Sequence, residues 1–535
     1  MPDMDARKSH RTADSVNGVE ARIGQQSARS EQNGLEVGFP KPDRVICTGP
    51  GAGSLLGPAL RMMAKSPLLV FLAATAVMLS SAPAKLAAEN APERASLAIV
   101  LTSVPKDTNG PIYVAGTFNH WHTADPDLEL KRGPDGRYRI TLPMAVQRQV
   151  EFKFTQGLWL NVEKDASGQE VPNRVLTLTR SGVSTYEGTV ESWRHPTNED
   201  LQTYRACRSD LEWLPAFVFE NDSGARAEVD AKGEEAFASA FADALSFVSS
   251  VTSDDACLAI LNDYLRMYRV GHLWVARIVH EPEGQRGNGP PAPSFRILST
   301  RTALITLPSF EIVFKDQVAK LIKGHRSDIL KHPNLIIDVR GNGGGSDSVY
   351  QPLMPFVRAN PVHQFGVEFL ATPENVKSTD IVAKKVAETC PECAASIAAM
   401  AKRMQDAPAG TFVSAGPDED YDPGEVTRDP QRVAVLIDRH CASSCEQFAL
   451  DARRHFKVKL FGRPTFGSLD YSNLRPTDLP SGKRQIWRAT SRSGRLPELP
   501  IDGIGVQPDQ LLKRPENRAQ IDAEVDKVKA VLEAR

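Results

Sequence analysis

Two adjacent serines lie between two cysteines in "DRHCASSCEQFA", Asp438 to Ala449. The segment follows the apolar run "VAVLI" and precedes a helical pattern, so the serines are expected at the start of a helix. Backbone N–H groups there have no partner within the helix, and together with the helix dipole they stabilise an oxyanion. The position suits a nucleophile for acyl transfer. It equally suits a plain N-cap, because serine favours that position.

A second distinctive stretch is the glycine-rich "DVRGNGGG", Asp338 to Gly345, which also follows an apolar strand pattern. Sites in parallel sheets gather beyond the carboxyl ends of the strands, where backbone N–H groups and a nucleophile can be presented together. The alternative, a phosphate loop at "GNGGGS", lacks the Lys-Ser/Thr pair of a P-loop and the spacing of the dinucleotide fingerprint. We therefore expect acyl-transfer chemistry, with no cofactor and no metal site.

The elements that position these stretches alternate between strand and helix patterns over residues 271–513. The expected strands are "TALITLP", "NLIIDVRGNGGG", "VAVLID" and "KLFGRPTFG", and the expected helices are "FKDQVAKLIKGHR", "SVYQPLMPFVRA" and "SCEQFALDARRHF". This alternation indicates an α/β core with a largely parallel sheet. A helical segment, 198–270, precedes the core, and a C-terminal helix, 514–535, follows it. The irregular stretch from Phe365 to Val426 predicts no particular element.

Four short segments, in order, resemble one family of enzymes. They are "VGHLWV", "LIIDVRGNGGG", "CASSCEQFA", and "GRPTFGS" followed by "IDGIGVQPD". They resemble the D-G-H-T, D-L-R-x-N-x-G-G, S-A-S-E, P-T-x-G and G-V-x-P-D segments of the C-terminal-processing (tail-specific) and tricorn-core serine peptidases. The resemblance covers Val270 to Leu512. It implies a ClpP/crotonase-like α/β fold and a protein or peptide substrate.

The family pattern distinguishes the two serines. In its S-x-x-E segment the nucleophile precedes the Glu by three residues, and counting back from Glu446 gives Ser443. The resemblance therefore implies Ser443 as the nucleophile. The backbone N–H of Ser444 would help Gly341 or Gly343 to form the oxyanion hole. A plain N-cap remains the alternative for Ser443.

The general base separates two branches of the family. Tail-specific enzymes have a Lys after "TFG", where this chain has Ser468. Tricorn-like enzymes use a His before the sheet and an acidic residue near the C-terminus, which implies His272 and Asp502 here. Histidine also suits proton transfer near neutral pH, because its reference pKa is about 6.5. We therefore expect a Ser/His/Asp arrangement of the tricorn-like kind.

Two departures and three alternatives stand beside this assignment. Gly271 replaces the Ser that precedes the His in tricorn-like enzymes, and Asp502 replaces their Glu. His272 has the alternative of a buried structural histidine, and Asp502 that of a turn residue before "GIG". His440 is a rival base, although it lies only three residues before Ser443 and would point poorly at it.

Three residues near these segments are expected to support the substrate or the nucleophile. Glu446 either orients the nucleophile helix or contacts the substrate. The segment "PTFG" is expected in the wall of the substrate cleft, with Phe466 as its apolar surface. Ser468 follows that segment directly.

Residues 96–190 have a different pattern of short alternating strands, "IYVAGTF", "RYRITLPM", "VEFKFTQG" and "NRVLTLT". Turn signals such as "GPDG" and "DASG" separate them. This pattern predicts an Ig-like antiparallel β-sandwich ahead of the helical segment and the core. The chain is therefore expected to be multidomain.

The same module resembles the starch- and glycogen-binding sandwich modules through "VAGTFNHWHTADPDLELKR" and "EFKFTQGLWLNVEKDASGQEVPNRVL". In such modules exposed aromatic rings stack on sugars, while Lys and Asn bind hydroxyl groups. The resemblance implies Trp121, Trp159, Lys164 and Asn173 as candidates for glycan binding. The alternative is that both tryptophans are structural and that the module is a spacer.

The apolar run "PLLVFLAATAVML" is short for a membrane span and precedes small residues, which is typical of a secretory signal. We expect the signal at 62–88, beginning at Met62 or Met63. Residues 1–61 would then be disordered or not part of the protein. The alternative is a cytoplasmic tail before a membrane anchor. A signal places the protein in the periplasm or outside the cell, in contact with a membrane only if this segment stays uncleaved.

Six cysteines follow that region, an even number that predicts disulfides in an oxidising compartment. One pairing joins Cys207 to Cys257 and ties "CPEC" to "CASSC". A zinc site built from the same two motifs is the alternative. The six are Cys207, Cys257, Cys390, Cys393, Cys441 and Cys445.

Composition narrows the classes of function. The 64 basic and 66 acidic side chains give a net charge of -2, which offers no electrostatic argument for binding nucleic acid. The sequence thus predicts a secreted or periplasmic serine endopeptidase, with a glycan as a further candidate partner. Two alternatives stay open: a catalytically impaired peptidase-fold protein that binds glycans or peptides, and an esterase.

Overall fold

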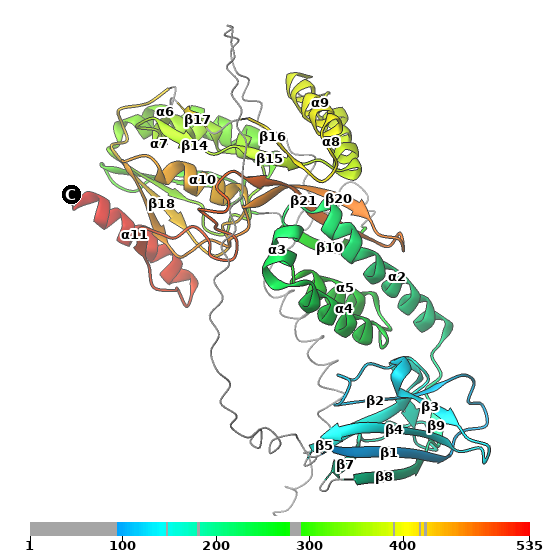
Figure 1. Cartoon of the computed structure of the whole chain (residues 1–535). Coiled ribbons are helices and arrows are strands. Elements are labelled where there is room, and N and C mark those ends of the chain that lie inside the picture. Colours follow the sequence, from blue (N-terminus) through cyan, green and yellow to red (C-terminus); the bar gives the residue numbers. More distant parts are fainter. Residues whose placement is uncertain are drawn as a thin grey trace, which may run out of the picture. The chain divides into compact units, whose positions relative to one another are not determined.

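A computed structural model of the chain describes residues 94–145, 148–178, 182–278, 290–388, 391–416, 419–421 and 425–534. The expected upstream segment and signal lie outside these residues. The chain divides into two compact units, one ending at Arg194 and the other continuing from His195 to Arg535. Each unit is described by itself, with its elements labelled in Figure 1.

The first unit is built from strands that pair mostly antiparallel. Seven of them form one continuous sheet in the order β7-β5-β2-β3-β4-β1-β8, because β3 pairs with both β2 and β4. β1 and β8 pair in parallel, so the expectation of a purely antiparallel module is wrong at this edge. The strands are β1(Arg94–Ser103), β2(Ile112–Gly116), β3(Glu129–Arg132), β4(Tyr138–Ala145), β5(Arg148–Thr155), β6(Glu163–Lys164), β7(Arg174–Leu178), β8(Gly182–Thr189) and β9(Ser192–Trp193).

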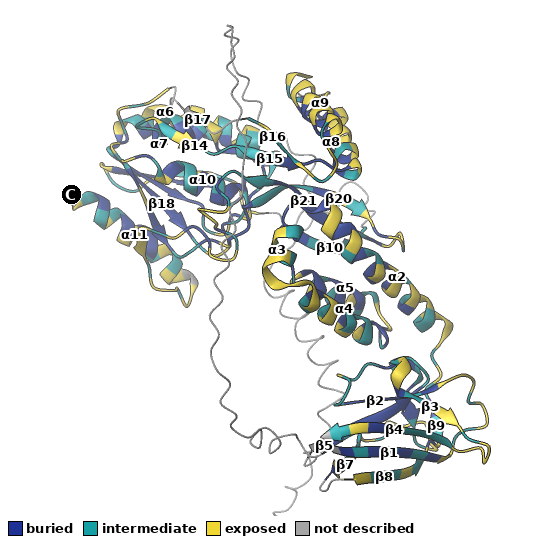
Figure 2. Cartoon of the chain, in the orientation of Figure 1, coloured by how far each residue is buried: buried dark blue, intermediate teal, exposed yellow. Residues whose placement is uncertain are grey.

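Alternation along these strands builds the core of the unit. Leu97, Ile99 and Leu101 on β1 are fully buried, as are Phe152 and Phe154 on β5. Successive side chains of a strand point to opposite faces, so every second residue enters the same core. Figure 2 shows the buried residues gathered inside this unit and exposed ones along its edge strand β8.

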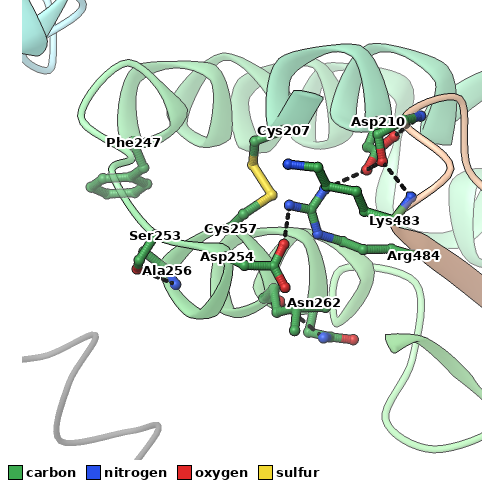
Figure 3. Close-up of a disulfide and its surroundings, with 12 residues drawn as sticks. Cys207, Asp210, Phe247, Ser253, Asp254, Ala256, Cys257, Asn262, Lys483 and Arg484 are labelled. Atoms are coloured by element: carbon green, nitrogen blue, oxygen red, sulfur yellow. Dashed lines mark hydrogen bonds and ion pairs between the residues drawn. A yellow bond between two sulfur atoms is a disulfide. The ribbon is translucent and has the colours of Figure 1, made fainter. Parts of the chain in front are cut away.

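The second unit begins with a helical layer: α2(Asn198–Asn221), α3(Ala225–Lys232), α4(Glu234–Val248) and α5(Asp254–Leu265). The helix α2 starts with a capping box, in which Thr197 and Asp200 each accept a hydrogen bond from the other's backbone N–H. The disulfide Cys207–Cys257 joins α2 to α5 across 50 residues (Figure 3). This pairing confirms the prediction for these two cysteines.

A fully buried arginine lies beside this disulfide. Arg484 forms ion pairs with Asp210 on α2 and Asp254 on α5, and neither Arg484 nor Asp210 is exposed (Figure 3). Arg484 begins β21(Arg484–Ser493), so these pairs connect the helical layer to a sheet.

A six-stranded sheet forms the centre of the second unit, in the order β11-β12-β13-β18-β19-β22. All neighbours pair in parallel except β11 and β12. Asp338 at the end of β13 is in register with Leu436 on β18, so the glycine-rich exit and the serine-bearing exit lie side by side. The strands are β11(Ser294–Ile297), β12(Thr302–Thr306), β13(Asn334–Asp338), β18(Arg432–Ile437), β19(Val458–Gly462) and β22(Gln510–Leu511).

Helices cover both faces of this sheet. Ile337 and Val435 belong to one apolar cluster with residues of α6(Lys315–Lys331) and α10(Ser444–Arg453). Ile336 and Leu436, which point the other way, pack with residues of α11(Arg518–Glu533). The α/β core with a largely parallel sheet, expected from the strand and helix alternation, is therefore present, and it has three layers.

One predicted helix is wrong. The stretch "SVYQPLMPFVRA" forms η4(Asp347–Val349), η5(Gln351–Leu353) and the single turn α7(Met354–Val357). Pro352 and Pro355 explain the interruption, because proline has no backbone N–H and its ring clashes with the preceding turn of an α-helix.

A second sheet lies between the helical layer and the central sheet. It has the order β10-β21-β15-β16, with β20 also paired to β21, and the stacked rings of Trp274 and Trp487 connect β10 to β21. The stretch that predicted no element contributes two of its strands and a helix pair. The elements are β10(Leu273–Arg277), β15(Val367–Leu370), β16(Phe412–Ser414), β20(Tyr471–Asp478), α8(Pro373–Val386) and α9(Pro391–Asp406), with the small pair β14(Val362–Gln364) and β17(Glu419–Tyr421) beside them.

Within the described part of the chain, no helix is both long enough and apolar enough to cross a membrane. The expected signal segment was not among the residues searched.

Replacing Arg484 by Ala should destabilise the second unit strongly. The change leaves Asp210 as a buried charge without its cation, which typically costs about 3–5 kcal/mol of unfolding free energy. Urea unfolding of the full chain should show a much lower midpoint. The control Arg266→Ala removes an exposed pair with Asp263 and should change the midpoint little. Equal effects of the two changes would contradict this assignment.

Candidate active site

Ser443 occupies a strained turn at the start of α10. Its φ of 56° and ψ of -123° lie in a region that residues other than glycine rarely adopt, and such strain is concentrated at functional sites. The disulfide Cys441–Cys445 spans the serine, and both sulfur-bearing residues are buried. The turn is therefore fixed on both sides of the serine.

This disulfide corrects the predicted pairing. Cys441 and Cys445 bond to each other, so neither is tied to the "CPEC" motif or left as a zinc ligand. Cys393 is also disulfide-bonded, and Cys390 lies outside the described residues.

The glycine-rich loop after β13 packs directly on the serine turn. A Cβ on Gly344, whose φ is 97°, would lie 2.8 Å from Ser443 Cβ and 2.5 Å from the Ala442 oxygen, so only glycine fits there. Ala442 N–H donates to the Asn342 carbonyl at 3.2 Å. The Ser444 hydroxyl donates to the Gly345 carbonyl at 2.9 Å. The two strand exits are thus held together by their own backbones.

Two of the three N–H groups expected in the oxyanion hole make no other hydrogen bond within the described residues. Gly341 N–H donates to the Asp438 carboxylate at 3.0 Å, so its expected role in the oxyanion hole is wrong. Across the described residues, the N–H groups of Gly343 and Ser444 have no hydrogen-bond partner. The next amide, of Gly344, donates to the Asn342 side chain at 2.9 Å.

Glu446 is a fully buried carboxylate that accepts four hydrogen bonds. One oxygen accepts from the Thr465 hydroxyl at 2.5 Å and from Gly467 N–H at 2.7 Å. The other accepts from Ser468 N–H at 2.9 Å and from Ser443 N–H at 3.1 Å. Burial raises its pKa, and these four bonds partly offset that rise. Glu446 therefore positions the serine turn against the segment 465–468.

The other two expected support residues differ in exposure. Phe466 is exposed, as expected for apolar surface in a cleft wall, whereas Ser468 is buried and its backbone is bound by Glu446.

His272 is buried, with its ring orientation fixed by a backbone oxygen. Its Nδ1 lies 2.6 Å from the Tyr471 carbonyl, which can only accept, so we assign the proton to Nδ1 and the lone pair to Nε2. Burial lowers the pKa of His272 to about 4, and the nearby Arg269 lowers it further. The ring is therefore neutral at physiological pH.

Arg269 contacts the backbone of His272 and the ring of Tyr471. Its guanidinium pairs with the buried Asp222, donates to the His272 carbonyl at 3.3 Å, and lies 4.9 Å from the centre of the Tyr471 ring. The same cation thus contacts both the histidine backbone and the residue that accepts from the histidine ring.

Packing explains why Gly271 replaces the serine of the resembling enzymes. A Cβ on Gly271 would lie 2.6 Å from Ser468 Cβ and 2.9 Å from Phe466 Cε1, and its φ is 80°. Gly271 therefore brings the histidine segment against the same short segment that Glu446 binds. His272 is thus connected to Ser443 by a continuous series of contacts, which runs from Gly271 to Ser468 and then through Glu446.

Asp502 does not hold the His272 ring, and the predicted role is wrong on this point. Its Oδ1 accepts from the N–H groups of Leu469 and Asp470 at 2.6 and 2.8 Å, and its buried Oδ2 has no hydrogen-bond partner. In turn, Oδ2 of Asp470 accepts a hydrogen bond from Asp502 N–H at 2.7 Å. Burial raises the pKa of Asp502 to about 7, and the neighbouring Asp470 adds to the rise.

The rival base gains no support from its surroundings. His440 is exposed, and its Nε2 accepts from Arg439 Nε at 3.3 Å.

Three residues of the site were missed from the sequence. Arg269 precedes His272 by three residues, a spacing that could have drawn attention to it. Tyr471 acts through its backbone oxygen, and Asp470 through a turn contact, so no side-chain pattern reveals either.

Residues 301–512 match the model of Peptidase family S41. The match covers 212 of the 535 residues, so this segment is similar to that family. The similarity supports a serine-type peptidase, the class of enzyme expected from the sequence.

Similar solved structures include a putative peptidase from Parabacteroides merdae, at 15% identity and a TM-score of 0.40, which covers 60% of this chain and 96% of that chain. The photosystem II D1 C-terminal processing protease is similar at 12% identity and a TM-score of 0.26, over 70% of this chain and 57% of that chain.

Curated relatives match a shorter part of the chain. An α-amylase from Niallia circulans is 44% identical over 94 residues, which is 17% of this chain and 7% of the amylase. An amylopullulanase from Thermoanaerobacterium thermosulfurigenes is 35% identical over 96 residues, 17% of this chain and 5% of that protein. The chain thus spans less than a tenth of the length of these two relatives.

Replacing Asp502 by Asn should flatten the pH dependence of stability. The folded pKa is about 7 against an ordinary 3.8, so the folded state binds the proton more tightly and loses stability as the pH rises from 4 to 7. The full shift corresponds to a loss on the order of 4 kcal/mol. Asparagine keeps an acceptor oxygen and does not titrate, so the loss should shrink.

Urea unfolding at pH 4, 5.5, 7 and 8 measures this effect. The control Asp263→Asn, at an exposed surface position, should leave the wild-type slope unchanged. A wild-type slope in Asp502→Asn would show that the carboxyl titrates normally in the folded protein.

Proposed function

We propose that the chain is a secreted or periplasmic serine endopeptidase in which Ser443 attacks the peptide carbonyl and His272 takes its proton. The observation that carries this proposal is the serine turn itself. Ser443 sits at a strained backbone position beside the N–H groups of Gly343 and Ser444, which have no partners in the described part of the chain. Such donors stabilise the oxyanion that forms after attack.

The histidine is prepared to act as a base without prior loss of a proton. Because its pKa is about 4, the imidazole is neutral over the whole physiological range. Its Nδ1–H donates to Tyr471, which leaves Nε2 as the basic atom. After accepting the serine proton, the imidazolium can return it to the leaving amine.

We assign the orienting role to the Tyr471 carbonyl and not to a carboxylate. Asp502 instead organises the turn that carries Leu469 and Asp470, immediately before Tyr471. This arrangement belongs with the His-dependent, tricorn-like branch of the family. The absence of a lysine at Ser468 supports the same choice.

Location outside the cytoplasm is supported by disulfides of the second unit, among them Cys207–Cys257 and Cys441–Cys445. Disulfides persist in oxidising compartments. The apolar segment expected as a signal is consistent with export.

A serine-directed fluorophosphonate should label the wild-type chain and should fail to label Ser443→Ala. Ser444→Ala is the matched control, because it keeps the backbone N–H and loses only the hydroxyl bond to Gly345. Mass spectrometry of the labelled chain, with casein turnover in parallel, measures both effects. Loss of labelling in Ser444→Ala alone would overturn the assignment of Ser443. An unlabelled, inactive wild type would favour the catalytically impaired alternative.

We also propose that the first unit is an Ig-like carbohydrate-binding module. The similarity to segments of an α-amylase and an amylopullulanase supports this, since the matches of 94 and 96 residues are close in length to the expected module, 96–190. Trp121 and Trp159 lie together, with ring centres 6.1 Å apart, and both are partly exposed. A pair of adjacent aromatic rings suits stacking on sugars.

The two polar candidates are engaged within the unit. Lys164 is ion-paired with Glu170, and Asn173 donates to Glu151 at 3.1 Å. The tryptophan pair is therefore the stronger part of the proposed glycan site.

Affinity electrophoresis in gels containing glycogen or soluble starch tests the module. The wild-type chain should be retarded, and Trp121→Ala and Trp159→Ala should migrate faster. Val183→Ala removes an exposed apolar residue from the same unit and should be retarded like the wild type. Unretarded wild-type protein would argue for a spacer.

A further inference from the structure

A pocket lies next to the serine turn within the second unit. Six of its lining residues are Gln447, Arg454, Leu469, Ser472, Ser493 and Arg495. Gln447 follows Ser443 by about one turn of α10, so the pocket adjoins the nucleophile. Leu469, another lining residue, donates its N–H to the Asp502 carboxylate at 2.6 Å.

Arg495 is a buried cation with unused donors at this pocket. Its side chain is 5% exposed. Among the described residues, its guanidinium makes one hydrogen bond, from Nη2 to Asp470 at 2.9 Å, and its buried Nε has no partner. A guanidinium carries five N–H donors, and a buried donor without an acceptor is costly. An acceptor that enters the pocket would remove this cost.

The acids that pair with the two arginines of the lining also accept hydrogen bonds from other residues. Asp470 accepts from Arg495 and also from the N–H groups of Ile501 and Asp502. Asp451 accepts from the Tyr350 hydroxyl at 3.0 Å and from Gln447 at 2.8 Å. Both carboxylates therefore have other donors besides the arginines.

Arg454 places a second cation on the lining. It lies 3.7 Å from Asp451 and 5.6 Å from the centre of the Phe365 ring. The remaining polar lining is uncharged and comes from Gln364, Gln447, Ser472 and Ser493. A ligand that suits this lining is a small anion whose oxygens accept hydrogen bonds from the guanidinium of one arginine.

We propose that this pocket binds a carboxylate of the substrate close to the scissile bond, with Arg495 as the residue that recognises it. The guanidinium fork matches a carboxylate in a bidentate geometry. The inference rests on the proposed peptidase function. The carboxylate has two sources, the C-terminus of a peptide and an acidic side chain, and the experiment separates them.

The experiment measures binding of fluorescent peptides to the full chain carrying Ser443→Ala, which prevents turnover. One pair of peptides differs only in a free or an amidated C-terminus, and a second, amidated pair differs only in an internal Glu or Gln. We expect one acid to bind at least about tenfold more tightly than its neutral partner, as for a hydrogen bond to a charged group. A preference within the first pair identifies the C-terminus, and one within the second identifies the side chain.

The variant Arg495→Lys keeps the positive charge beside Asp470 but loses the paired N–H donors of the guanidinium. The ratio of affinities between the acidic and the neutral peptide should therefore fall towards one. Arg492→Lys is the matched control, because Arg492 lies on β21 only three residues before Arg495, pairs with Glu368 and does not line the pocket. Equal binding within both pairs would overturn the proposal. So would a preference that survives Arg495→Lys.

Turnover of casein and fluorophosphonate labelling of the wild type are measured in parallel. An active wild type without acid preference would overturn only this inference. An inactive wild type whose acid preference depends on Arg495 would overturn the peptidase function and leave a carboxylate-binding pocket.

Discussion

The buried carboxylate of Glu446 is the contact on which the rest of the site depends. It is the third residue of α10, and its four acceptor bonds join the serine turn to the segment 465–468. That segment leads into β20 of the second sheet, whereas Ser443 follows β18 of the central sheet. A buried carboxylate without these donors would be too costly to maintain, so the bonds and the burial require each other. Ser443, the proposed nucleophile, is thereby fixed relative to a different sheet from its own.

His272, the proposed base, is held by buried contacts of the same kind. His272 begins the turn into β10, and its ring is held by a backbone oxygen 199 residues along the chain. Arg269 and Asp222 add a buried ion pair that connects the end of α2 with this turn. Together with Arg484 and its two acids, this pair ties the helical layer to the second sheet. Such pairs stabilise little by themselves, but each fixes one relative position of two elements, because a misplaced partner would leave a charge buried alone.

The sequence predicts the parts of this site that are local and fails where the contact is distant. The two strand exits could be predicted, because apolar strands, glycines and a capped helix leave a clear pattern around residues 334–345 and 432–453. The disulfide Cys441–Cys445, the use of Gly341 N–H by Asp438 and the Tyr471 carbonyl could not, because each depends on where backbone atoms meet after folding. Asp502 illustrates the limit well. Its position follows the family pattern, yet its oxygens serve the backbone of a neighbouring turn.

The exchange of a carboxylate for a carbonyl at His272 has a chemical consequence. A carboxylate beside an imidazole raises its pKa and stabilises the imidazolium, whereas a neutral carbonyl holds the ring and contributes less charge stabilisation. Burial and Arg269 then leave the pKa of His272 at about 4, so the proposed base is neutral but weakly basic. In the proposed mechanism, catalysis would therefore rely more on the oxyanion donors and on the positioning of the substrate. The strained, disulfide-spanned serine turn, which one of the four hydrogen bonds to Glu446 holds, supplies that kind of preorganisation, so the proposed nucleophile can also begin the helix.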